Sequence, residues 1–143
     1  MKKIILLLTT ILFFSCGQSN EESKETSIKE QNKDHIAVYD FHTTHRCETC
    51  LAIEKATKET LTKNFKSQVD DQIITFTLIN ADAEENQNIA EEYEAFGTTL
   101  AITIIKNGEK EIIDITNWAF DAVQGDDFEA ELTEKLNDAL GKL

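Results

Sequence analysis

Two cysteines lie three positions apart in the segment Cys47-Glu48-Thr49-Cys50. Two thiols at this spacing can form a disulfide and can exchange it with another protein through a mixed disulfide. A bridge between them closes a very small loop. Because loop-closure entropy grows with loop length, such a bridge adds little stability to the folded chain. The pair is therefore better explained by redox chemistry than by structural cross-linking.

The two thiols are expected to differ in reactivity. Cys47 begins a predicted helix, where free backbone N–H groups and the helix dipole stabilise a thiolate. Arg46 precedes it and adds a positive charge that lowers a thiol pKa, whereas Glu48 acts in the opposite direction. Cys50 falls on the apolar side of the same helix. We therefore predict Cys47 as the attacking thiol, Cys50 as the resolving thiol and Arg46 as a residue that tunes the pKa.

A second chemistry is open to the same segment. His42 and His45 precede the cysteines, so two imidazoles and two thiolates stand within nine residues. This ligand set suits zinc or copper, and a metal carrier using His42, His45, Cys47 and Cys50 is the alternative hypothesis. A third reading is a non-catalytic accessory subunit. The redox reading requires no organic cofactor, because the electrons reside on the two sulfurs.

The surrounding pattern alternates between strand and helix periods. Strands are predicted at residues 36–42, 73–79, 100–105 and 109–115, and helices at 47–66, 82–96 and 126–140. Residues 116–125 fit neither pattern and are predicted to form a short turn or helix on the core. A β-α-β unit requires parallel strands, and the Asn107-Gly108 turn requires an antiparallel pair. The fold class is therefore α/β, with a mixed four-stranded sheet and helices on both faces.

Three local details follow from the same pattern. Asp82 with Glu85 is predicted to cap the second helix, and Asp126 with Glu129 the last one. Helical spacing also places Phe96 on the packed side of the second helix, which is expected to stop at Gly97.

The order of motifs resembles the thioredoxin superfamily over residues 36–140. The stretch IAVYDFHTTHRCETC supplies strand, loop and cysteine pair, and LAITIIKNGEKEII resembles the third and fourth strands of that family with their Lys-Asn-Gly turn. The resemblance implies a thioredoxin-like fold and thiol–disulfide exchange by Cys47 and Cys50. It also implies a partner protein that restores the redox state of the pair.

Two positions depart from that family. The family carries a buried carboxylate near the cysteine pair, and Asp40 stands one residue further from Cys47 than that pattern requires. The family also places a cis-proline before the third strand. This chain has no proline, and Thr99 and Leu100 occupy the region. The departure leaves metal binding open.

A narrower resemblance covers the cysteine motif and the helix after it. The stretch FHTTHRCETCLAIEKATKETL is similar to a small group of exported thioredoxin-like lipoproteins known as nitrophenyl-compound nitroreductase subunits. The likeness is carried by His42, Arg46, Cys47, Thr49, Cys50, Ile53 and Glu54. We take from it the export and the cysteine pair, and not a nitroaromatic substrate.

The N-terminus has the pattern of an export signal. Met1-Lys2-Lys3 is basic, and the apolar run that follows is too short to span a membrane. Its end resembles a bacterial lipoprotein box, so residues 1–16 are predicted to be a lipoprotein signal ending at a lipidated Cys16. The alternative is an ordinary cleaved signal followed by an unrelated cysteine. Residues 17–33 are polar and predict a flexible tether, and residues 34–143 predict one thioredoxin-like domain.

The charge of the chain limits its partners. The formal net charge is −13, and it becomes −15 if Lys2 and Lys3 leave with the signal. A surface this acidic repels phosphate backbones, so nucleic acid is excluded as a partner. The expected contacts are a bacterial membrane, reached through the lipid and facing the periplasm or cell exterior, and a redox partner protein. The acid excess is explained by solubility, or more weakly by a docking face for a basic partner.

The anchor can be tested by metabolic labelling with a lipid precursor. The wild-type protein is expected to carry the label, and the Cys16→Ser variant is expected to lack it, because the thioether bond requires the cysteine sulfur. Equal labelling of both proteins, or a wild type that leaves the membrane fraction, would show that Cys16 is not an anchor.

Overall fold

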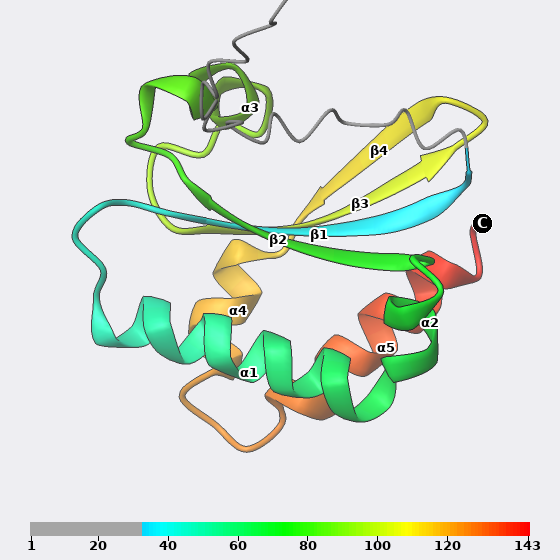
Figure 1. Cartoon of the computed structure of the whole chain (residues 1–143). Helices are drawn as coiled ribbons and strands as arrows, with labels where there is room; N and C mark the ends of the chain where they lie inside the picture. Colours follow the sequence, from blue (N-terminus) through cyan, green and yellow to red (C-terminus); the bar gives the residue numbers. More distant parts are fainter. Residues whose placement is uncertain (1–32) are drawn as a thin grey trace, which may run out of the picture.

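The computed structural model of the chain describes residues 33–143 (Figure 1). The predicted signal, Cys16 and all but the last residue of the predicted tether lie outside the described residues. Within them, no helix is long and apolar enough to cross a membrane.

The predicted order β-α-β-α-β-β-α is confirmed. The strands are β1 (His35–His42), β2 (Ile74–Asn80), β3 (Thr99–Lys106) and β4 (Glu109–Asp114). The helices are α1 (Glu48–Asn64), α2 (Lys66–Asp70), the 3-10 turn η1 (Glu84–Asn86), α3 (Gln87–Glu92), α4 (Thr116–Ala122) and α5 (Phe128–Leu140). The additions to the predicted order are α2 and η1, and α4 lies in residues 116–125, where a short turn or helix is predicted.

The four strands form one mixed sheet in the order β2-β1-β3-β4. Strand β1 is parallel to β2 and antiparallel to β3, and β3 is antiparallel to β4. The register sets Phe41 opposite Thr99 and His42 opposite Asn80. The C-terminal ends of β1 and β2 therefore lie beside the start of β3, at one end of the sheet. The β1–α1, β2–η1 and α3–β3 connections all lie at this end.

Helices cover both faces of the sheet, as expected. Helices α1, α4 and α5 lie on one face and α3 on the other (Figure 1). This strand order, these strand directions and this placement of helices make the fold thioredoxin-like. The α/β assignment made from the sequence is confirmed by the order and direction of the strands.

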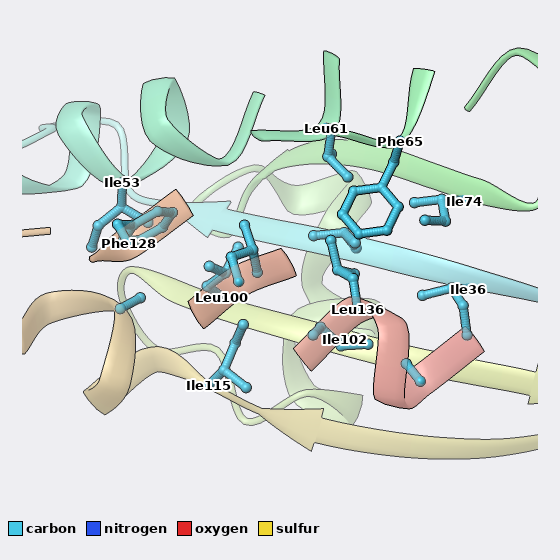
Figure 2. Close-up of a cluster of buried hydrophobic side chains, with 14 of the residues drawn as sticks. Ile36, Ile53, Leu61, Phe65, Ile74, Leu100, Ile102, Ile115, Phe128 and Leu136 are labelled. Atoms are coloured by element: carbon cyan, nitrogen blue, oxygen red, sulfur yellow. The ribbon is translucent and has the colours of Figure 1, made fainter. Parts of the chain in front are cut away.

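The larger core lies between the sheet and the α1–α5 layer (Figure 2). It forms because alternate residues of the central strands face the apolar stripes of two helices. Its members include Ile36, Val38, Ile53, Leu61, Phe65, Ile74, Leu100, Ile102, Phe128, Leu132 and Leu136. This core fixes the axis of α1, and so fixes where the first turn of that helix lies.

A smaller core lies on the α3 face. It joins Phe41 of β1 to Tyr93 and Ala95, which follow α3, and to Ala101 of β3. The Tyr93 hydroxyl and the Thr103 hydroxyl form a buried hydrogen bond of 2.8 Å. This contact attaches the end of α3 to the sheet.

The second predicted helix ends earlier than the sequence indicates. Helix α3 stops at Glu92, and Glu94 adopts a left-handed backbone with φ of 50°. The chain turns there, and the N–H of Ala95 donates to the carbonyl of Ala90 at 2.8 Å. Tyr93 is buried as expected, but Phe96 is 87% exposed. The prediction that Phe96 lies on the packed side of a helix is therefore wrong.

The predicted cap of the last helix is also wrong. Helix α5 begins after Asp127, and no side-chain hydrogen bond caps it there, so neither Asp126 nor Glu129 has that role. Glu129 instead contacts the end of α1, where Lys63 lies at 2.7 Å and the Asn64 amide donates at 3.2 Å. This contact joins the two helices of the larger core at the surface.

The segment that fitted neither pattern contains α4. Its Trp118 ring packs at 5.0 Å from the Phe128 ring, centroid to centroid, and its indole N–H donates to Glu131. Ala119 is fully buried in the larger core. The expected docking of this segment on the core is thus confirmed, as a two-turn helix.

Candidate functional site

Cys47 and Cys50 form a disulfide at the first turn of α1. Their Cα atoms are 5.1 Å apart. Cys47 is the N-cap residue and is exposed, whereas Cys50 is only 7% exposed. The predicted difference in position between the two sulfurs is therefore present in the structure.

The first turn of α1 points a hydrogen-bond donor at the exposed sulfur. The backbone N–H of Cys50 donates to Cys47 Sγ at 3.1 Å. Unpaired N–H groups and the dipole of a helix attract negative charge at its N-terminus. A thiolate on Cys47 would occupy this place after reduction, while Cys50 sits beside buried Ile53 in an environment that disfavours charge.

The β1–α1 loop, which carries the site, is hydrogen-bonded to the β2–η1 loop. The N–H of Thr44 donates to Asp82 Oδ2 at 2.7 Å, and Thr43 Oγ1 donates to the His45 carbonyl at 2.9 Å. The hydrogen bond from Thr44 is the main cause that lowers the pKa of Asp82. Asp82 was predicted to cap a helix with Glu85. That prediction is wrong, since η1 has no side-chain cap and Asp82 holds the site loop instead.

Arg46 is folded back over α1. Its guanidinium pairs with Glu54, and the side chains are 19% and 15% exposed. Lys58 binds the other carboxylate oxygen of Glu54. Hydrogen bonds from Lys58 and then Arg46 lower the pKa of Glu54. The positive charge predicted to tune Cys47 is thus partly neutralised by a carboxylate eight residues away, a pairing with no local signal in the sequence.

Asp40 lies fully buried in β1, on the strand face that points toward α1. Neither carboxylate oxygen has a hydrogen-bond partner within residues 33–143. Burial raises the pKa of Asp40 from 3.8 to about 6, while Arg46 acts to lower it and Glu54 to raise it. Asp40 therefore interacts with Arg46 and Glu54, two charged residues close to the cysteine pair in the sequence. The resemblance implies a buried carboxylate near the cysteine pair, and Asp40 is a buried carboxylate in the strand that precedes the pair.

The four residues of the metal hypothesis do not converge. His42 Nδ1 donates to the carbonyl of Thr43 at 2.9 Å, and His45 is exposed. In the described part of the chain, no group of three or more His, Cys, Asp or Glu side chains is placed to hold a metal ion.

The position that carries a cis-proline in thioredoxins is different here. Thr99 begins β3, is buried and pairs with Phe41 of β1. None of the peptide bonds described is cis. The start of β3 therefore continues the regular antiparallel pairing with β1.

Two solved structures show limited similarity to the chain. A thioredoxin from Thermus thermophilus has 20% sequence identity and a TM-score of 0.37, over 55% of this chain and 58% of that one. A structure described as a malarial protein has 13% identity and a TM-score of 0.37, over 63% of this chain and 93% of that one. No protein-family model and no curated protein matches the sequence. The fold assignment rests on strand order and direction rather than on these similarities.

The raised pKa of Asp40 predicts a pH-dependent effect on stability. Folding disfavours the ionised form, so the wild type loses stability as the pH rises through the window from 3.8 to about 6. Asp40→Asn removes this cost. We expect the variant to gain up to about 3 kcal/mol in unfolding free energy at pH 7.5 and almost nothing at pH 4, because the difference between a pKa of 3.8 and one of about 6 corresponds to about 3 kcal/mol.

The measurement is urea unfolding of both proteins across this pH range. Asp138→Asn, which removes an exposed acid from α5, is the matched control and should show no such trend. A gain that stays constant from pH 4 to pH 7.5 would show that Asp40 is not a buried acid with a raised pKa.

Proposed function

We propose that this chain is an exported, membrane-anchored thiol–disulfide oxidoreductase or electron-relay protein. The observation that carries the proposal is the asymmetric pair at the start of α1. Cys47 is exposed and accepts a helix N–H, and its bonded neighbour Cys50 is buried. An attacking thiol requires access and a stabilised thiolate, and a resolving thiol requires shelter beside it.

The exchange can be written in two steps. In the reduced protein, the Cys47 thiolate attacks one sulfur of a partner disulfide, forms a mixed disulfide and releases the other partner sulfur as a thiolate. Cys50 then loses its proton and attacks Cys47 Sγ, which releases the second partner sulfur and leaves the Cys47–Cys50 disulfide. Two electrons pass from the protein to the partner, and the reverse sequence oxidises the partner.

The cellular setting in this proposal comes from the sequence. The basic start, short apolar run and Cys16 favour export and a lipid anchor, and an oxidising compartment lets a disulfide persist. The likeness of residues 41–61 to the exported thioredoxin-like lipoproteins agrees with this setting. A membrane or soluble redox protein is then required to return the pair to its working state.

The proposal predicts unequal thiols. In a Cys16→Ser background, the reduced Cys50→Ser variant should be alkylated fast, with a midpoint below the free-thiol value of about 8.5, because Cys47 lies at the helix N-terminus. It should also trap mixed disulfides with partner proteins, since the resolving thiol is gone. The measurement is alkylation rate against pH, with the trapped complexes identified by mass spectrometry.

The matched variant is Cys47→Ser, which leaves buried Cys50. It should be alkylated slowly, with a midpoint above that of Cys47, and should trap no partner. The assigned roles are wrong if both thiols titrate alike near the free value, or if Cys50 reacts faster than Cys47.

A further inference from the structure

Phe96 stands beside a surface hollow of about 370 Å³. Ala81, Ala90 and Ala95 form the apolar part of this hollow, and Glu91 lines it as well. The Phe96 ring is 87% exposed, whereas Ala90 and Ala95 are buried. An exposed aromatic ring next to a hollow floored by small apolar side chains is a surface suited to receive an apolar side chain from another molecule. We call this surface the Phe96 hollow.

The backbone holds Phe96 in this exposed position. Glu94 has φ of 50°, a left-handed conformation that is unfavourable for a residue other than glycine. The Phe96 N–H donates back to the Glu94 carbonyl at 3.1 Å. The packing of Tyr93 and Ala95 on the smaller core fixes the turn on both sides of Glu94. Local strain kept in place by packing is a feature of binding surfaces.

The Phe96 hollow adjoins the disulfide loop. Asp82 lines the hollow and also accepts the hydrogen bond from the Thr44 N–H, three residues before Cys47. The β1–α1 and α3–β3 connections lie at the same end of the sheet in Figure 1. A partner segment that presents a cysteine to Cys47 can therefore continue across this end of the sheet into the hollow.

The charge around the hollow selects the partner. Residues 67–105 contain eight acidic residues and no Lys or Arg. Glu92 pairs with Lys110 at 2.9 Å. The other acids at positions 82–94 are exposed and pair with no cation in the portion of the chain described. Such a surface attracts cationic segments and repels acidic ones.

We propose that the Phe96 hollow binds an extended segment of the redox partner in which an apolar side chain, flanked by Lys or Arg, lies near the reacting cysteine. The apolar side chain packs on Phe96 and the three alanines, and the cations lie against the acids of η1 and α3. This inference rests on the proposed function, and it adds the class of partner: a protein with a basic, apolar segment next to its disulfide.

The test uses the full-length protein in a Cys16→Ser background. Two short peptides, each with one cysteine blocked by glutathione, differ only in whether a leucine is flanked by lysines or by glutamates. The reduced protein should react faster with the lysine peptide, and this preference should shrink as salt is added. Phe96→Ala should lower the rate with the lysine peptide about tenfold, as expected for loss of an aromatic anchor. Ile112→Ala, a truncation of an exposed side chain on β4, is the control and should leave the rate unchanged.

Two further measurements separate this inference from the proposed function. Oxidised glutathione has neither an apolar side chain nor a lysine for the hollow to bind, so its rate reports on the cysteine pair alone. A cysteine-to-serine version of the lysine peptide reports on docking alone, through NMR shifts of residues 81–96 in the oxidised protein. Reaction with glutathione but equal rates for both peptides, or an unchanged rate in Phe96→Ala, overturns the docking inference. Absence of any exchange overturns the proposed function, and the serine peptide then still decides whether the hollow binds.

Discussion

The proposed thiol chemistry depends on one hydrogen bond, from the Cys50 N–H to Cys47 Sγ at the start of α1. That bond exists because the larger core fixes α1 against the sheet through Ile53 and Leu61. The β1–α1 loop then has to deliver Cys47 to the open end of the helix. With the helix axis fixed, one sulfur faces solvent and the backbone donor, and the other is enclosed.

A group of charges beneath and beside α1 partly counteracts the stabilisation of a thiolate. Asp40 is buried without a hydrogen bond, Arg46 pairs with Glu54, and two nitrogens of Arg46 are also buried without a partner. A negative charge in such a site raises the free energy of a nearby thiolate, whereas the guanidinium lowers it. Asp40, Arg46 and Glu54 also interact with one another, so Arg46 is one member of a charge network rather than an isolated cation.

The sequence was sufficient for the parts of the fold that follow from periodicity. The spacing of Cys50, Ile53 and Leu61 placed Cys50 in the core, and the Asn107-Gly108 turn implied the β3–β4 pair. Prediction from the sequence failed where contacts join residues distant in the chain, or where the backbone departs from a regular helix. Asp82 has the spacing of a cap but binds Thr44, 38 residues earlier. Phe96 continues the helical spacing, but the left-handed turn at Glu94 ends the helix, and no local pattern marks that turn.

The reduction potential of the Cys47–Cys50 pair tests the central claim most directly. It can be measured by equilibrating the protein in thiol–disulfide buffers and counting free thiols by mass spectrometry. If the pair is a working redox couple, it should exchange two electrons reversibly, with a potential between about −270 and −120 mV, the range of thioredoxin-like oxidoreductases. A potential below about −300 mV, or a pair that does not equilibrate with the buffer, would mark a structural disulfide and contradict the account.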